Sequence, residues 1–364
     1  MIDSARAPAV MHESLCRFAP CLADDASAGP FDDDCIARID CTDVDELTEQ
    51  IRDWTAEFSQ LSPGAFAASG LMVPLGSMLV GAATFSGSLL QRGTPPVGCL
   101  SIVLPGRGCD RFVCCGRDLM EGQCMVLGAG ANAEAVSRGT SVVVAVSVGN
   151  DAWQSASDWV AECSVALGRR VLRRTPGIDW TESVLDGVAW ILDAFVKYPQ
   201  RAKSRAASAS MSDLMLVRLH DLADTAAQPR NSRREHNRRR IAVARARSFI
   251  HENLTSPIRL SELCTHAHAQ ARSLEYGFQE IVGMSPVSYI RTLRLNRVHR
   301  LLRSKDTAER TITEIALDCG FWHLSQFAVD YRRFFGESPS AVQRPAPDTR
   351  LSRSHATQPQ SVLC

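Results

Sequence analysis

Polar, basic and aromatic side chains recur on one face of two segments in the last third of this 364-residue chain, around residues 272–279 and 323–333. An arginine on a helix can hydrogen-bond both major-groove acceptors of guanine, and a glutamine can pair with adenine. A glutamate accepts from the amino group of cytosine, whereas other arginines neutralise phosphates. The pattern therefore favours a DNA-binding surface with these candidate residues: Arg272, Glu275, Tyr276, Gln279, Arg294, His323, Ser325, Gln326, Val329, Arg332 and Arg333.

The charge of the chain is divided in the same way. The sequence has 40 basic and 40 acidic residues, but residues 230–344 hold 20 of the basic and 11 of the acidic ones, a net charge of +9. The rest of the chain has the opposite net charge. Such segregation is typical of proteins in which one part binds a polyanion. The arginines within residues 233–240 either add to this attraction or form a solvated linker.

An internal repeat lies in this basic third. The motif GMSP at 283–286 recurs 53 residues later as GESP at 336–339. Each copy predicts a short helix, a tight turn and a longer helix, which is the arrangement of a helix-turn-helix unit. In each motif the glycine is expected to end one helix, the serine to cap the next and the proline to take its first position. The same offset aligns Leu274 with Phe327, Phe278 with Tyr331, Ile281 with Phe334, and Arg291 with Arg344.

Two helix-turn-helix units are therefore predicted, over residues 255–282 and 308–335. A single helix over residues 286–303 joins them; at about 1.5 Å per residue it spans about 27 Å, so it can hold the two longer helices near one DNA turn apart. The other helices are expected at 260–266, 271–282, 312–318 and 323–335. The residues expected to face inward on the longer helices are Leu274, Phe278, Ile281, Leu324, Phe327, Tyr331 and Phe334.

The stretch LSELCTHAHAQARSLEYGFQEIVGMSPVSYIRTLRLNRVHRLL and the following TITEIALDCGFWHLSQFAVDYRRFFGESPSAV resemble the DNA-binding domain of the AraC/XylS family of transcription regulators. The resemblance covers Ile241 to Arg344 and includes both units, the joining helix and the GF…F…Y…FG…P ending. It implies double-stranded DNA, RNA polymerase and a small-molecule effector as partners. Upstream, IRDWTAEFSQLSPGAF and a strand ending in Leu104-Pro105-Gly106, together with GFWHLSQFAVDY, are similar to the ethanolamine-operon regulators of this family.

One departure from the family pattern lies at Ala269-Gln270-Ala271, where family members usually have an apolar residue followed by Ser or Thr. Glutamine is a poor N-cap, so we expect this end of the first recognition helix to be looser by about 1 kcal/mol. The second unit matches without such a gap, which makes it the expected better anchor on DNA.

Upstream of the repeat, residues 63–148 consist of short β-branched and small-residue runs cut by glycines. They predict about seven antiparallel strands in a sandwich or barrel, of jelly-roll or cupin-like type. The spacing of Val44, Leu47, Ile51, Trp54 and Phe58 predicts one amphipathic helix, with Thr42 and Asp45 as its capping box. Further helices are expected at 152–172, 179–198 and around 211–224.

The expected fold class is therefore α+β, with a β-rich N-terminal domain flanked by helices and an all-α C-terminal domain. The boundaries follow composition. We expect a disordered acidic N-terminus (1–40), a β-rich regulatory domain (41–225), a basic linker (226–240), the DNA-binding domain (241–344) and a disordered tail (345–364).

The β-rich region offers little that could support catalysis or bind a metal. It has no histidine between His12 and His220 and no Gly-x-Ser-x-Gly motif, so we expect neither an enzyme nor a metal site. Cys109, Cys114, Cys115 and Cys124 cluster there without Cys-x-x-Cys spacing. They are best interpreted as buried apolar thiols, with a thiol-based redox sensor as the alternative.

The sequence as a whole predicts an effector-responsive, sequence-specific DNA-binding regulator, most simply an activator. Neither a secretory signal nor an apolar run long enough to span a membrane is evident, which favours the cytoplasm. No cofactor is implied beyond a small-molecule effector, and a homodimer is possible. The competing interpretation is a protein-interaction module that uses the C-terminal domain only to dock on DNA.

Overall fold

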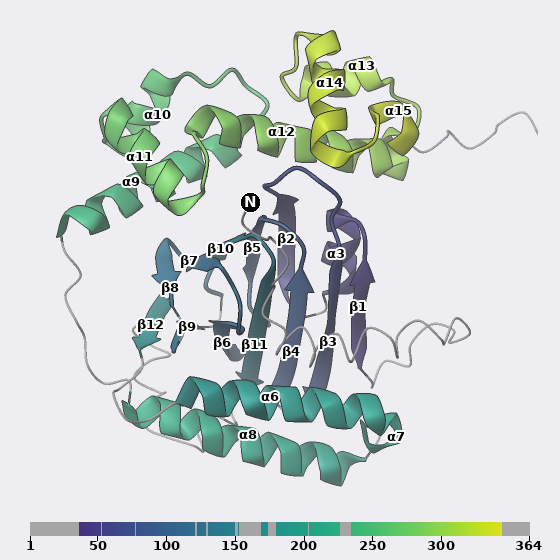
Figure 1. The fold of residues 1–364 in the computed structure, drawn as a ribbon, viewed down its shortest axis with the longest axis vertical. Helices are drawn as coiled ribbons and strands as arrows, with labels where there is room; N and C mark the ends of the chain where they lie inside the picture. Colours follow the sequence, from purple (N-terminus) through teal and green to yellow (C-terminus); the bar gives the residue numbers. More distant parts are fainter. Residues whose placement is uncertain are drawn as a thin grey trace, which may run out of the picture.

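The computed structural model describes residues 36–51, 53–76, 78–120, 122–128, 130–149, 152, 169–173, 180–202, 204–225 and 234–343. It has a β-rich N-terminal part and an all-helical C-terminal part, which lies across one side of the β-rich part (Figure 1). The predicted α+β fold class is confirmed. None of the helices in the described residues is both long and apolar enough to cross a membrane.

Two antiparallel sheets form the β-rich part. The larger has the order β1-β3-β4-β11-β6-β9-β12 and the smaller β2-β5-β10-β7-β8. Residues 63–148 contain nine strands rather than about seven, because glycines with positive φ, such as Gly108 and Gly116, place turns inside the apolar runs. The strands are β1 (Ala37–Cys41), β2 (Thr55–Gln60), β3 (Ala68–Leu75), β4 (Met78–Phe85), β5 (Leu89–Thr94), β6 (Cys99–Pro105), β7 (Arg111–Cys114), β8 (Arg117–Leu119), β9 (Gln123–Leu127), β10 (Ala133–Arg138), β11 (Ser141–Gly149) and β12 (Arg169–Arg173).

The amphipathic helix predicted over Val44–Phe58 is only half correct. Helix α3 covers Val44–Gln50, and the chain then enters β2 after Asp53, whose φ of 65° breaks the helix. Both segments bury their apolar residues in the same cluster between the sheets, so the helical spacing continued by coincidence. The cap also differs from the prediction, since the side chain of Asp43, rather than that of Thr42, accepts from the backbone N–H of Asp45.

Three helices follow the sheets: α6 (Trp180–Lys197), α7 (Pro199–Ala202) and α8 (Arg205–Thr225). Helices α6 and α8 bury their apolar faces against the larger sheet, with Val188, Leu192 and Met215 in one cluster with Val80 and Val146. The helix predicted at 179–198 is confirmed, and the one around 211–224 begins earlier. Most of the helix predicted at 152–172 lies outside the described residues, and its last four residues belong to β12.

The C-terminal part consists of helices that match the repeat. Helix α9 (Arg234–Glu252) extends into residues that the sequence assigned to the linker, since its arginines favour helix and its far end packs on the first unit. Strand β1 likewise lies partly within the predicted disordered N-terminus, and the predicted tail lies outside the described residues. The remaining helices are α10 (Leu260–Ala267), α11 (Ala271–Ile281), α12 (Pro286–Arg303), η1 (Lys305–Thr307), α13 (Ile312–Asp318), α14 (Leu324–Phe335) and α15 (Pro339–Val342).

Candidate nucleic-acid interface

The first unit is formed by α10 and α11, and it has its own apolar core. Leu274 and Phe278 of α11 are fully buried against α9 and α12, and the ring of Phe278 meets that of Tyr289 edge-on at 5.6 Å between centroids. Burying these residues fixes which face of α11 points outward. The opposite face is therefore free to meet a ligand.

The second unit, α13 and α14, repeats this construction. Phe327, Tyr331 and Phe334 are buried beside Ala316 and Cys319, as the repeat predicts. The prediction for Leu324 is wrong, because this residue is 36% exposed at the first position of α14 and lies outside the core.

The ends of the recognition helices α11 and α14 agree with the repeat only in part. Gly283 and Gly336 take left-handed conformations with φ of 89° and 84°, and Ser285 caps α12 with Pro286 at its first position. Gln270 makes no side-chain cap bond, as predicted from the sequence. However, His323 makes none at α14 either, so capping does not favour the second unit.

The predicted base-reading residues lie on the outer faces of α11 and α14. They are exposed, and some of them contact neighbouring side chains. The guanidinium of Arg272 lies 5.8 Å from the centre of the Tyr276 ring, and Nε2 of Gln326 donates to Asp330 at 3.0 Å. Trp322, 68% exposed beside His323, was missed by the sequence interpretation, although an aromatic residue after a left-handed glycine was a visible signal. The exposed candidates are Arg272, Glu275, Tyr276, Gln279, His323, Ser325, Gln326, Val329, Arg332 and Arg333.

Arg294 differs from the other candidates because its side chain is engaged inside the domain. Its guanidinium donates to Ser256 O at 2.7 Å, Leu254 O at 3.0 Å and Gly320 O at 3.4 Å. A Cβ on Gly320 would lie 2.9 Å from the Arg294 Cζ, so only glycine allows this approach. Arg294 therefore connects the loop before α10 with the turn of the second unit, which fixes the spacing of the two units.

The variant Arg294→Ala tests whether Arg294 has a structural role or binds a DNA phosphate. We expect the variant to lose about 2 kcal/mol of unfolding free energy, because its charged hydrogen bonds to three backbone carbonyls are lost. The salt dependence of DNA affinity should keep its slope. Loss of a phosphate contact would instead reduce the slope of log affinity against log salt concentration by about one. Urea unfolding and salt titrations of the full chain with DNA distinguish these outcomes, and a reduced slope with unchanged stability would contradict the structural role.

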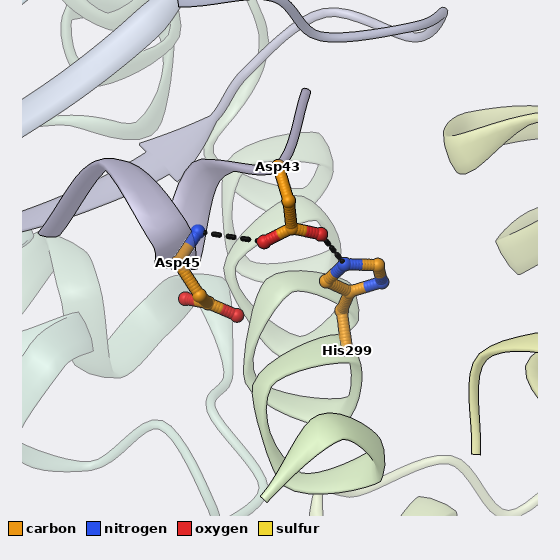
Figure 2. Close-up of side chains that lie close together, drawn as sticks. All are labelled: Asp43, Asp45 and His299. Atoms are coloured by element: carbon orange, nitrogen blue, oxygen red, sulfur yellow. Dashed lines mark hydrogen bonds and ion pairs between the residues drawn. The ribbon is translucent and has the colours of Figure 1, made fainter. Parts of the chain in front are cut away.

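Helix α12 also contacts the β-rich part of the chain. The imidazole of His299 lies between Asp43 and Tyr331, with Nε2 2.7 Å from the Asp43 Oδ2 and Nδ1 2.6 Å from the tyrosine hydroxyl. Figure 2 shows Asp43 accepting both from the backbone of Asp45 and from the imidazole. Because His299 and Asp43 are almost fully buried, this contact forms part of the core between the domains.

Two arginines of α12 extend the contact. Arg300 pairs with Asp45 and Glu57, and Arg303 pairs with Asp43 at 3.1 Å and with Glu46. In addition, the amide of Asn296 exchanges hydrogen bonds with the backbone of Gln60. These contacts all join α12 to α3 and β2 or their flanking residues.

The carboxylates of Asp43 and Asp45 lie with His299 within 4.8 Å, as in a metal site. The guanidiniums of Arg300 and Arg303 already neutralise both carboxylates, so the cluster is an ion-pair network instead. Burial alone would raise the pKa of Asp43, but the hydrogen bond and charge of His299 and the charge of Arg303 outweigh burial and lower that pKa. The pKa of Asp45 is raised, because burial outweighs the attraction of Arg300.

The first unit contacts the β-rich part through strands β5 and β10. Arg247 of α9, 3% exposed, pairs with Glu134 at 3.1 Å and lies 3.3 Å from the Tyr289 hydroxyl. His251 contacts the same hydroxyl at 3.1 Å. Burial and the charges of Arg92 and Arg247 lower the pKa of His251 to about 3, so it is neutral at physiological pH. The β-rich part thus contacts both units.

The cysteine cluster shows no sign of a reactive thiol. Cys114 and Cys124 are buried as expected, whereas Cys109 and Cys115 are partly exposed. Burial still raises the pKa of Cys109 to about 11. A thiolate is the reactive form of cysteine, and these surroundings disfavour it. The geometry thus supports the structural interpretation of the cluster.

Two exposed recognition helices on one connecting helix define a helix-turn-helix DNA-binding domain. Residues 263–345 match the family described as a helix-turn-helix domain. The chain is 45% identical over 92 residues to the XylDLEGF operon transcriptional activator 2 of Pseudomonas putida, a match that covers 25% of this chain and 59% of that protein. The C-terminal region is therefore similar to the helix-turn-helix domains of transcription regulators.

The chain is also similar to a second curated relative and to a solved structure. The HTH-type transcriptional activator RhaR of Pectobacterium carotovorum is 38% identical over 95 residues, covering 26% of this chain and 32% of that protein. A solved structure of a probable AraC family regulator from Rhodopseudomonas palustris is 37% identical, with 29% of this chain and 98% of that chain covered and a TM-score of 0.28. The chain spans 59% and 30% of the length of the first two curated relatives it matches.

Proposed function

We propose that this chain is a sequence-specific transcription regulator that reads two adjacent major-groove sites, one with each recognition helix. The observation that supports the proposal is the exposure of the predicted base-reading faces of α11 and α14 on units joined by the single helix α12. Because Arg294 and the interdomain ion pairs fix this arrangement, the two sites should have a fixed spacing. The names of the relatives favour an activator. We propose in addition that it contacts RNA polymerase in the cytoplasm, and that it reads DNA rather than catalysing a reaction.

Selection from genomic DNA tests this proposal. The full chain is incubated with fragments at two salt concentrations, and the bound DNA is sequenced. We expect a motif with two half-sites about 10 base pairs apart, and weaker binding at the higher salt. Enrichment of no motif at either concentration would reject sequence-specific reading and favour the protein-interaction module. Membership of the ethanolamine-operon branch also remains a proposal, which the genes beside the recovered sites would test.

We propose further that the β-rich domain binds a small effector in the cavity between its sheets. This cavity has a volume of about 120 Å³ and an almost wholly apolar lining, which includes Trp54, Phe58 and Phe112. An engineered apolar cavity of similar size, about 150 Å³, binds benzene. The Nε2 atom of Gln91 is buried at this cavity without a hydrogen-bond partner. The lining therefore fits a compact, largely apolar molecule with one hydrogen-bond acceptor.

The smaller sheet supports coupling between this cavity and DNA binding. Ala135 lines the cavity, whereas the preceding residue of β10, Glu134, pairs with Arg247 of α9. Side chains of a strand alternate between its faces, so one strand separates the cavity from the DNA-binding domain. A ligand that moves β5 or β10 therefore acts on the domain contact, which is the differential interaction that a two-state switch requires.

A cavity-filling variant tests effector binding. Single-ring and compact aliphatic compounds with one acceptor would be screened by the melting temperature of the full chain, and a ligand at 100 times its Kd should add about 2.7 kcal/mol of stability. Ala145→Leu, on the larger sheet and lining the cavity, should abolish the shift that such a compound causes. Ala206→Leu, at an exposed position of α8, is the control and should retain it. An equal shift in Ala145→Leu would place the ligand elsewhere.

A further inference from the structure

The last turn of helix α11 has less stabilisation than that of α14. Neither helix has a side-chain cap bond at its N-terminus, but no basic residue lies in the last turn of α11. Helix α14 instead carries Arg332 and Arg333 in its last turn. Cations there interact favourably with the unpaired carbonyls and the negative end of the helix dipole. The first recognition helix therefore lacks a stabilising charge that the second one has in its own sequence.

The β-rich domain supplies that charge. Arg138, the last residue of β10, donates from its Nη2 to Gln279 O at 2.7 Å and to Glu280 O at 2.8 Å. These are carbonyls of the last turn of α11. The guanidinium also lies against Gly283, where a Cβ would be only 3.0 Å from the Arg138 Cζ. A left-handed glycine thus ends the helix and leaves room for an arginine from another domain.

We propose that Arg138 is a positioning residue for DNA recognition, which holds the first recognition helix in its reading orientation from the β-rich domain. The inference rests on the proposed two-site DNA binding. Strand β10 also places Glu134 against Arg247 of α9 and Ala133 and Ala135 in the cavity lining. The same strand therefore contacts the effector cavity, the first helix-turn-helix unit and the end of its recognition helix. A change in β10 would therefore act on the DNA half-site that α11 reads, which makes this half-site the regulated one.

The consequence is specific to one half-site. Without Arg138, α11 loses its interdomain anchor, whereas α14 keeps its own basic last turn and its contacts with α12 and α15. Contacts made by α11 in the groove should weaken, and those made by α14 should not. A general loss of folding would instead weaken both half-sites together.

The experiment uses the full chain and the motif recovered by genomic selection, with each half-site scrambled in turn. The half-site read by α11 is the one at which Arg272→Ala loses discrimination. We expect Arg138→Gln to weaken binding to the intact probe by about 5–10-fold and to leave binding to the probe with a scrambled α11 half-site within about twofold of the unsubstituted chain. Arg138→Lys, which retains the charge, should recover part of the loss.

Arg117→Gln is the matched control, because it removes the same charge from an exposed position on β8, the edge strand of the same sheet. It should bind all probes like the unsubstituted chain. Equal losses of Arg138→Gln on both scrambled probes, or no loss on the intact probe, would overturn the positioning role while leaving two-site binding intact. Failure of the unsubstituted chain to bind any probe would instead remove the proposed function, and the positioning role with it.

Discussion

Asp43→Asn should destabilise the full chain by about 3 kcal/mol, the lower end of the range for breaking one partner of a buried ion pair. Asparagine is as good an N-cap as aspartate, so the cap of α3 is kept and only the charge is lost. The loss leaves Arg303 with Glu46 as its partner and removes the charged acceptor of His299. Urea unfolding at pH 7 measures the change.

Asp45→Asn is the matched control, because Asp45 lies two residues away in the same ion-pair network. The pKa of Asp45 is raised, because its burial outweighs the attraction of Arg300, and its Oδ2 is buried without a partner. Removing this charge should change stability by less than about 1 kcal/mol, because Arg300 keeps Glu57 and the carbonyl of Phe58. Equal costs for the two substitutions would show that the network is not organised around Asp43 and His299.

The contributions of Asp43 and Asp45 to folding stability should depend on pH in opposite directions. The folded-state pKa of Asp43 is lowered, so its stabilisation is present above its unfolded pKa of about 3.9 and is lost as the pH falls through the lower folded value. The pKa of Asp45 is raised, so its contribution is present at low pH and is lost as the pH rises through the folded value. The acid destabilisation below pH 4 should therefore be smaller in Asp43→Asn than in the unsubstituted chain.

Gln326→Ala should weaken binding to the cognate site by about 10–100-fold, the usual effect of losing a bidentate base contact of 1–3 kcal/mol. Gln326 is exposed on α14, where Asp330 orients its amide. The loss should be confined to one base pair, at which the variant no longer discriminates, and the salt slope should stay unchanged. Equilibrium binding to probes that carry each base at each position of the motif measures this.

Two further variants set the scale for this prediction. Arg333→Gln should weaken binding to all probes alike and lower the salt slope by about one, as expected for a phosphate contact. Ser340→Ala, at an exposed position of α15, should have no effect. If Gln326→Ala weakened every probe equally, glutamine would be contacting the backbone rather than a base.

The helices of the DNA-binding domain could be predicted because their signals are local. The GxSP motifs and the buried apolar spacing of α11 and α14 involve residues only a few positions apart, and α12 was predicted with the observed bounds. The exposed base-reading faces follow from the same periodicity, since burying one face of a helix leaves the other outside. Local patterns also explain the error at Trp54 and Phe58, whose helical spacing was satisfied by a strand.

The contacts between domains could not be predicted, because they join residues far apart in the chain. Asp43 and His299 are separated by 256 positions, and Arg138 and Gln279 by 141. No motif marks Asp43, which lies between the two residues predicted to form the capping box, Thr42 and Asp45. Arg294 was predicted to contact DNA, but its guanidinium donates to three backbone carbonyls, and these contacts depend on how the two units pack. Sequence spacing cannot distinguish an arginine that contacts phosphate from one that holds two units together.

In the proposed function, α12 and its anchors fix the distance between the two reading units. The most direct test is the affinity of the full chain for its selected motif with 5 base pairs inserted between the half-sites, which moves one half-site by about half a turn. We expect affinity to fall at least tenfold, to the level of a probe with one scrambled half-site, and not to recover when 10 are inserted, because that insertion restores the helical phase but not the distance between the half-sites. Unchanged affinity with 5 inserted base pairs would contradict a rigid two-site reader.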